Sequence, residues 1–395
     1  MTLLYSNENA SQPGTHVLAV GVGSYPHLLG GTKKLANKPL GLKQLSSPPV
    51  STKALIDWFL APTIAPGTAG FSNDLAPLCT LEALVSDLVP LTVETPTGAK
   101  PLDPATRDNI QSAFESWLDR LSSNPDNIGV FYFCGHGLMV SEHYLLAEDF
   151  GRSKAQPWSQ AFDISTTIRA VEREAAGTTY FFIDACREIS RDVATTLGAN
   201  PNALQAVDLS KKVIRKSVTT IYATGEGELA FAPLGGAISR FTSALLSAMS
   251  GYAGIKTPGT STWNVDGESI AAAVRQLLEY YALEASGTAG TGKQVSEQSV
   301  QGSSIPLLRL TAAPLVKVWL DLTPAQRRAL YEIYLVSAKG NRFAQTQLDR
   351  IFKIDVPRGF YEVGANDPAG ALPAVVHPEE ELVPPFYKLD LHTQP

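Results

Sequence analysis

The sequence contains few cysteines, and their spacing does not pair them. Its 395 residues include only Cys79, Cys134 and Cys186. An odd number without paired spacing argues against a disulfide framework and fits a reducing, cytoplasmic environment. The N-terminal stretch lacks a basic region followed by an apolar one, so we expect no signal peptide. No run of about 18 apolar residues occurs, so we expect no membrane span and no membrane partner.

The sequence also lacks a net positive charge and the common cofactor-binding motifs. The net charge of -6 argues against a nucleic-acid partner, which would select a basic face. There is no P-loop and no G-x-S-x-G elbow, and Gly21-Val22-Gly23 lacks the third glycine of a dinucleotide fingerprint. No segment matches an EF-hand loop, and the acidic cluster Glu379–Glu381 is typical of solvated surface. We therefore expect no metal and no cofactor.

Apolar runs and helical periodicities alternate along most of the chain. This alternation predicts an α/β domain with a largely parallel sheet, whose buried strands carry apolar residues without alternation. The predicted strands are His16–Gly23, Gly129–Phe133, His143–Ala147, Thr178–Cys186, Val218–Thr224 and Ile305–Leu310. The predicted helices are Pro49–Leu60, Asp103–Leu121, Ile164–Ala175, Arg240–Met249 and Glu268–Ala282.

The composition changes near residues 312–314, which predicts a domain boundary there. We expect one domain over residues 1–312 and a C-terminal extension over 313–395. Within the extension, Leu322–Phe352 is predicted to be helical, with Thr323 as the cap and Pro324 in the first turn. The residues after it are rich in proline and acidic side chains, and we expect a tail there.

Two of the predicted strands end in residues that can carry chemistry. One ends in Gly135-His136-Gly137 and the other in Asp184-Ala185-Cys186-Arg187. In an open parallel sheet, sites form beyond the carboxyl ends of the strands. If the two strands are parallel neighbours, Cys186 and His136 meet at one edge. A nucleophilic thiolate needs a base beside it, and the pKa of histidine suits that role.

Glycines flank the histidine and let the backbone approach a substrate closely. The backbone amides of Gly137 and Cys186 are candidate oxyanion donors, and one such donor is worth about 2.7–4 kcal/mol in acyl transfer. Taken singly, a cysteine or a histidine is more often structural than catalytic, and Cys134 is interpreted as a core residue. The pairing of two strand ends is what favours catalysis.

At this point the sequence resembles the caspase and metacaspase superfamily of cysteine peptidases. The resemblance covers about residues 14–310 and includes VLAVGVGSY, VFYFCGHG, YFFIDACRE, IYATGEGELAF and SRFTSALLSAM. The 50 residues between His136 and Cys186 match the spacing of a caspase dyad. The resemblance implies a caspase-like α/β/α sandwich and hydrolysis of peptide bonds in a protein substrate. His136 and Cys186 would be the catalytic dyad.

The substrate pocket is predicted less directly. Asp184 stands where metacaspases carry a pocket aspartate, and Glu226 and Glu228 fall in another segment that lines the pocket in the family. Carboxylates there favour Arg or Lys before the scissile bond. Small or apolar side chains remain the rival preference. In the alternative interpretation, Asp184 caps a turn or pairs with Arg187.

Two features after Cys186 bear on regulation: the residues that directly follow it, and the long connection 189–217. The nucleophile is followed by Arg187-Glu188 rather than the His-Ser-Gly common in metacaspases, so calcium activation is not indicated. Residues 189–217 form a polar connection that contains Lys211, Lys212, Arg215 and Lys216, and it is either a site of self-cleavage or a plain solvated loop. By analogy with compact bacterial caspase-like proteins, we expect a regulated effector of defence or cell death, with an activating partner. The alternative is a catalytically silent scaffold that keeps the fold.

Overall fold

The computed structural model describes residues 3–7, 12–156, 158–187, 200–225, 236–284, 294–303, 305–345 and 351–393. The chain forms two compact units, each considered by itself below. The first comprises Met1–Leu246 and Asp266–Arg309, and the second comprises Ser247–Val265 and Leu310–Pro395.

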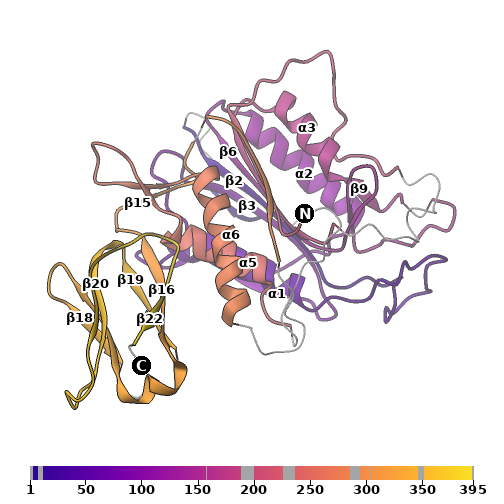
Figure 1. Cartoon of the computed structure of the whole chain (residues 1–395). Helices are drawn as coiled ribbons and strands as arrows, with labels where there is room; N and C mark the ends of the chain where they lie inside the picture. The colour runs from indigo at the N-terminus through magenta and orange to yellow at the C-terminus, as the bar shows by residue number, and fades with distance from the viewer. Residues whose placement is uncertain are drawn as a thin grey trace. The chain divides into compact units, whose positions relative to one another are not determined.

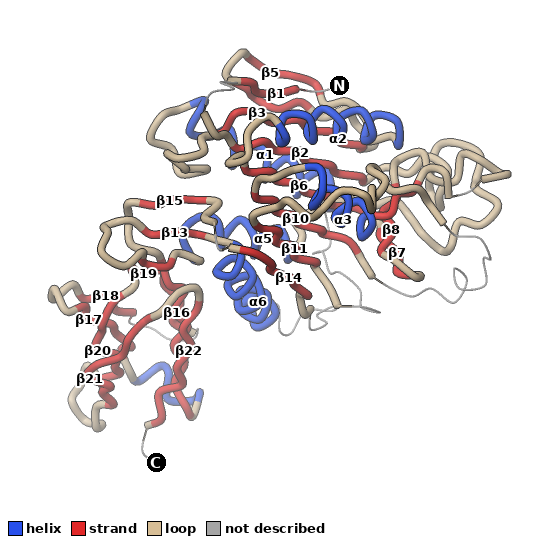
Figure 2. The backbone as a smooth tube through the Cα atoms, turned by 90° about the horizontal axis from the view of Figure 1, so that it is seen from above, coloured by secondary structure: helices blue, strands red, loops and turns tan. Residues whose placement is uncertain are grey.

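The first unit is built on a sheet whose described strands follow the order β1-β3-β2-β6-β10-β11-β14 (Figures 1 and 2). The five inner strands run parallel, and the edge strands β1 and β14 are antiparallel to their neighbours. The strands are β1 (Leu3–Ser6), β2 (Thr15–Val22), β3 (Leu78–Ser86), β6 (Ile128–Gly135), β10 (Thr178–Ala185), β11 (Ser217–Tyr222) and β14 (Glu297–Gly302). This confirms the expected largely parallel sheet.

Helices cover both faces of this sheet, as Figure 1 shows. On one face, α2 and α3 pack on Phe131 and Phe181. On the other face, Tyr132 meets α5 through Thr242, and α1 packs on β2 and β6. The helices are α1 (Ser47–Ile64), α2 (Arg107–Ser122), α3 (Ile164–Glu174), α5 (Arg240–Ser247) and α6 (Gly267–Glu284). The expected α/β/α sandwich is therefore confirmed.

Smaller elements complete the first unit. A short antiparallel sheet contains β7 (Gly137–Met139), β8 (His143–Leu146) and β9 (Ala161–Asp163), and it begins directly after β6. A hairpin joins β4 (Thr92–Thr95) and β5 (Gly98–Pro101). The predicted strand Ile305–Leu310 is present over Leu308–Leu310 (β15), but it belongs to another sheet, and β14 forms the edge of the main sheet.

The second unit corrects the prediction of a helical extension and tail over residues 313–395. Its described residues form two larger sheets, in the orders β19-β16-β22 and β18-β17-β20-β21, and a short antiparallel pair of β12 with β13. The strands are β12 (Ile255–Lys256), β13 (Trp263–Val265), β16 (Leu315–Thr323), β17 (Glu332–Ser337), β18 (Arg342–Gln345), β19 (Phe352–Pro357), β20 (Gly359–Asn366), β21 (Val375–Leu382) and β22 (Phe386–His392). A π-helical turn, Ala248–Tyr252, and a 3-10 turn, Ala325–Leu330, accompany them.

The physical reason for this correction lies in the period of the apolar residues. Val316, Val318 and Leu320 alternate along β16 and are buried, which is the period of a strand with one covered face. They pack with Leu335 of β17 and Val363 of β20, so the two sheets share one core. The residues that follow Thr323 and Pro324 make only the short 3-10 turn, and the predicted helix of Leu322–Phe352 is absent from the described residues.

Candidate active site

Strands β6 and β10 bring the two candidate catalytic residues to one place. They are parallel neighbours, as expected, and their last paired residues are Cys134 with Asp184 and Gly135 with Ala185. His136 directly follows β6, and Cys186 directly follows β10. Adjacent strands lie about 4.8 Å apart, so the two backbones leave the sheet side by side at its carboxyl edge.

The imidazole of His136 is held by contacts that fix its tautomer. Its Nε2 lies 2.7 Å from the carbonyl oxygen of Lys43. A carbonyl only accepts, so Nε2 carries the proton and Nδ1 is left as the basic atom. The backbone N–H of His136 donates to Tyr25 Oη at 2.8 Å, and the two rings lie 4.8 Å apart. The loop between β2 and α1 therefore orients the histidine from two sides.

The environment of His136 also sets its charge. Burial lowers the pKa of His136 to about 4, while the hydrogen bond to the Lys43 carbonyl opposes that shift. The side chain is half-buried and keeps some exposed area. At neutral pH the imidazole is neutral and can accept a proton.

The three cysteines differ in accessibility, and none forms a disulfide. Cys186 is half-buried, whereas Cys79 and Cys134 are buried. Burial and the nearby Asp184 raise the pKa of the Cys134 thiol well above its usual range, so Cys134 stays protonated at neutral pH. Accessibility therefore separates Cys186 from the other two thiols, because only a thiolate that a substrate can reach serves as a nucleophile.

Gly137 lies against the backbone of Cys186. A β-carbon at this position would come within 2.6 Å of the Cys186 carbonyl oxygen and 2.7 Å of His143 Nε2. Only glycine allows this close approach of two chain segments. The predicted oxyanion donors, the amides of Gly137 and Cys186, thus belong to segments in contact, and their role stays a prediction.

The predicted pocket residues have different outcomes. Asp184 is 4% exposed, and its carboxylate accepts hydrogen bonds from Ser239 and, at 2.7 Å, from Thr242 at the start of α5. Burial raises the pKa of Asp184, and these hydrogen bonds oppose the shift. Arg187, its partner in the alternative interpretation, instead forms an ion pair with Glu297 at 2.6 Å.

The remaining predicted residues, Glu226 and Glu228, lie outside the described residues. Within the described ranges, no group of three or more His, Cys, Asp or Glu side chains is placed to hold a metal ion. No described helix is long and apolar enough to cross a membrane. A cavity of about 170 Å³ contains none of the predicted site residues and is lined by Ala36, Asn37, Lys38, Phe150, Gly151, Ser153 and Lys154.

The sequence interpretation missed three groups that the structure adds to the site. They are the Lys43 carbonyl, the Tyr25 hydroxyl and the buried imidazole of His143, whose Nε2 lies 3.2 Å from the Cys186 carbonyl oxygen. The first two come from a loop more than 90 residues before His136. A backbone carbonyl leaves no signal in a sequence, although His143 could have been noticed as a polar residue in an apolar strand.

Comparison with known proteins identifies the family. The family model of the caspase domain matches residues 91–306, more than half of the chain. The chain belongs to the caspase family. It is also 34% identical over 291 residues to an uncharacterized protein, y4kE, of Sinorhizobium fredii, covering 71% of this chain and 82% of that one. Caspase-1 of Spodoptera frugiperda is similar in structure, with a TM-score of 0.39, 14% identity, and coverage of 77% of this chain and 95% of that chain.

Because the chain belongs to the caspase family, its first unit contains a domain of the cysteine peptidase class, whose substrates are proteins. The caspase domain match begins within the first unit and ends before β15, so it includes both His136 and Cys186. The strands of the second unit lie mostly beyond the match.

Two histidines of this caspase domain, His136 and His143, have lowered pKa values that should make its stability depend on pH. The pKa of His143 is lowered to about 3, first by burial, and that of His136 to about 4. Unfolded histidine titrates near about 6.5, so below that pH the unfolded chain binds protons that the folded chain does not. The free energy of unfolding should therefore fall as pH drops from 7 to 5.

The His143→Phe variant isolates this effect, because Asp184 and the other carboxyls are common to both proteins. We expect its urea midpoint to fall less between pH 7 and pH 5 than that of the wild type. Equal falls in the two proteins would contradict the buried, neutral state of His143.

Proposed function

We propose that this caspase domain hydrolyses peptide bonds in a protein substrate, with Cys186 as the nucleophile and His136 as its base. The observation that supports the proposal most strongly is the register of β6 and β10, which puts the two residues one step beyond the last paired residues of adjacent parallel strands. Lys43 and Tyr25 add support, because they orient an imidazole that burial keeps neutral.

The proposed reaction follows from the tautomer of His136. Nδ1 takes the thiol proton of Cys186, since Nε2 is already committed to the Lys43 carbonyl. The thiolate adds to the scissile carbonyl carbon, and the amides of Gly137 and Cys186 receive the developing oxyanion. The imidazolium then protonates the departing amine as the C–N bond breaks, which leaves a thioester.

Deacylation reverses these roles. Water gives its proton to neutral His136 and adds to the thioester carbon. The C–S bond then breaks, the acid product leaves, and the proton returns to the sulfur. The balance requires no metal and no redox partner.

We also propose that the residue before the scissile bond is Arg or Lys. Asp184 supports this preference, because it is a carboxylate two residues before the nucleophile on the same strand. Its hydrogen bonds with Ser239 and Thr242 fix the carboxylate in one position, and a cationic side chain brought beside it would lower its raised pKa. Small or apolar side chains are the rival preference.

A positional-scanning library of fluorogenic peptides tests both activity and preference. With wild type, we expect cleavage mainly in the Arg and Lys pools, with and without calcium. Asp184→Asn should lower those pools by about tenfold relative to the Ala pool, the loss of one charge-assisted interaction. Thr242→Val is the matched control, because it removes a donor to Asp184 and leaves the carboxylate.

Each failure in this experiment has a separate meaning. Cleavage in no pool would contradict the peptidase proposal and favour a silent scaffold. Cleavage confined to small or apolar pools would contradict the basic preference alone.

We further propose that the connection 189–217 is cut by the enzyme itself as part of its regulation as an effector. Residues 188–199 lie outside the described residues. In the described part, Lys211 pairs with Glu174 at 2.5 Å and Arg215 with Glu172 at 3.3 Å, and Lys216 pairs with Asp126. These ion pairs hold the end of the connection against the domain. Lys212 is exposed and forms no ion pair among the described residues, so it is the candidate cleavage residue in this part.

Intact mass after overnight incubation measures self-cleavage. We expect wild type to lose mass or separate into two fragments whose masses place a cut within 189–217, while Cys186→Ala stays whole. An uncut active protein would contradict self-cleavage, and a cut in both proteins would assign it to a contaminating protease.

A further inference from the structure

His143 is a buried histidine placed against the nucleophile's backbone. It begins β8, has no exposed area, and its Nε2 lies 3.2 Å from the carbonyl oxygen of Cys186. Because a carbonyl only accepts, Nε2 is the protonated nitrogen. Among the described residues, Nδ1 is buried and has no hydrogen-bond partner. A core position that only needed filling would be better served by an apolar ring, because an unpartnered polar atom costs folding free energy.

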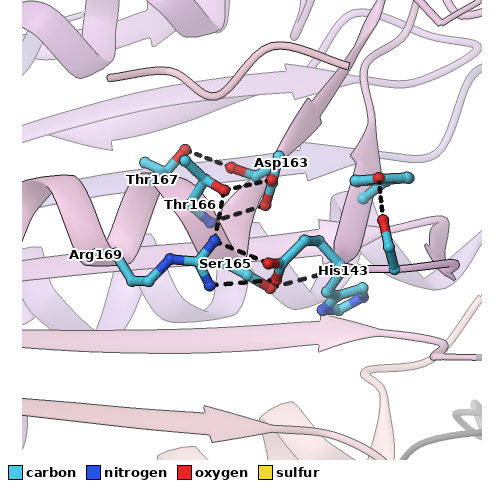
Figure 3. A network of polar contacts seen from close by, with 9 residues as sticks. His143, Asp163, Ser165, Thr166, Thr167 and Arg169 are labelled. Carbon is cyan, nitrogen blue, oxygen red and sulfur yellow. Dashed lines mark hydrogen bonds and ion pairs between the residues drawn. The ribbon is translucent and has the colours of Figure 1, made fainter. Parts of the chain in front are cut away.

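The position of the His143 backbone is itself fixed. Its N–H donates to Ser165 Oγ at 3.2 Å, and Ser165 lies in the first turn of α3 (Figure 3). Asp163 caps that helix by accepting from the Thr166 N–H at 2.8 Å. The neighbouring Glu142 pairs with Arg169 at 2.8 Å. A network of polar contacts thus holds the start of β8 and with it the imidazole.

The sheet ends before the Cys186 peptide, and the contact with His143 lies just beyond that end. The last ladder pair is Ala185 with Gly135, so the sheet fixes the chain only up to the residue before the nucleophile. His143 holds the carbonyl on the far side of the Cys186 α-carbon. Gly137 leaves just enough room for this contact, since a β-carbon there would overlap both the carbonyl and the imidazole.

We propose that His143 is a positioning residue, whose Nε2–H holds the Cys186 carbonyl and thereby aims the thiol at His136 and the Cys186 amide at the oxyanion. This inference rests on the proposed peptidase function. With the ladder on one side and His143 on the other, the backbone torsions of Cys186 are restrained, and the directions of Sγ and of the amide N–H follow from them. Preorganisation of this kind raises the rate of reaction more than it strengthens ground-state binding.

The surroundings keep His143 neutral, so that it positions the peptide without adding charge beside His136. Burial lowers the pKa of His143 to about 3, the charge of Arg187 lowers it further, and the Cys186 carbonyl opposes both. Arg187 itself pairs with Glu297 at 2.6 Å and lies over the ring of Tyr222, 4.4 Å from the guanidinium carbon. The Tyr222 ring in turn lies 5.5 Å from the imidazole.

Three variants test the role. His143→Phe keeps an aromatic ring and removes the donor, and we expect kcat to fall 10- to 100-fold with KM changed less than threefold. His143→Gln can donate from its own Nε2, and we expect it to recover at least a third of the wild-type kcat. His16→Phe is the matched control, because His16 is also buried but lies near the start of β2, at the opposite end of the sheet. We expect its kcat to stay within twofold of wild type.

A second measurement does not depend on peptide hydrolysis. The rate of Cys186 alkylation by iodoacetamide at pH 7, followed by peptide mass mapping, should be at least fivefold lower in His143→Phe, because a misaimed thiol loses its base. Equal alkylation rates in wild type and His143→Phe would overturn the inference, as would an unchanged kcat. A wild type that alkylates normally but cleaves no peptide would instead overturn the proposed function.

Discussion

Replacing Cys186 with alanine is expected to lower kcat/KM for peptide cleavage by at least about 10³-fold, the size of loss found when a catalytic nucleophile is removed. No other thiol can substitute. Cys134 is buried with a raised pKa, and Cys79 is buried near the start of β3, at the opposite end of the parallel strands. The measurement is the initial rate on the best peptide of the library, at several substrate concentrations.

Cys79→Ala is the control for this prediction, because it removes a buried thiol that the proposed reaction does not use. We expect its kcat/KM to stay within twofold of wild type. Residual activity above a tenth of wild type in Cys186→Ala would mean that another residue attacks the substrate.

The second large effect is expected at His136. His136→Ala should lower kcat by about 10³-fold, because the thiol loses its proton acceptor and the leaving amine loses its proton donor. Tyr25→Phe should produce a smaller loss of about tenfold, the cost of leaving the His136 N–H without its acceptor at about 1–3 kcal/mol. The loss of kcat should be smaller in Tyr25→Phe than in His136→Ala, because Tyr25 orients the histidine and His136→Ala removes it.

Circular dichroism and urea unfolding of both variants separate catalysis from folding. A His136→Ala variant that is folded and keeps wild-type kcat would remove histidine from the mechanism. A Tyr25→Phe variant with a larger loss than His136→Ala would show that the hydroxyl, rather than the imidazole, carries the chemistry.

The central sheet and its strands β6 and β10 could be predicted because a strand buried on both faces is recognisable from its apolar residues. Val130–Phe133 and Tyr180–Ile183 are buried on both faces of the sheet, so each is a continuous run of apolar and aromatic residues. Parallel neighbours then follow from the helices between them, and the shared register places the two strand ends together.

The edge of that sheet was not predictable in the same way. Strand β14 reads EQSVQG, and its side chains are mostly exposed. An antiparallel edge strand is held by backbone hydrogen bonds to one neighbour, so it needs few apolar residues. Apolar composition instead favoured Ile305–Leu310 as a strand, and its strand β15 joins a different sheet.

The C-terminal unit was mispredicted because its sequence supports two periods. LTPAQRRALYEIYL has a cap-like Thr323, Pro324 and good helix formers, yet Ile333 and Leu335, two residues apart on β17, both belong to the core of this unit. Their core partners lie in other strands, Val318 in the opposite sheet and Val363 in the neighbouring strand β20. Tertiary packing overrode local propensity, as it commonly does where a strand can bury one face.

The candidate site shows the same limit. Cys186 and His136 were predicted as candidates from the strand ends, but the groups in contact with them were not. Lys43 acts through its backbone carbonyl, and the contact of His143 with Cys186 depends on the absence of a β-carbon at Gly137. Such contacts depend on where loops meet in space, which residue types alone do not specify.

The most direct test of Cys186 as a nucleophile activated by His136 is covalent labelling by a peptidyl electrophile with Arg at its reactive end, followed by intact mass and peptide mapping. The account predicts one adduct per chain, located on Cys186, that forms at least 100-fold more slowly in His136→Ala. Labelling spread over Cys79, Cys134 and Cys186, or equal rates in the two proteins, would contradict it.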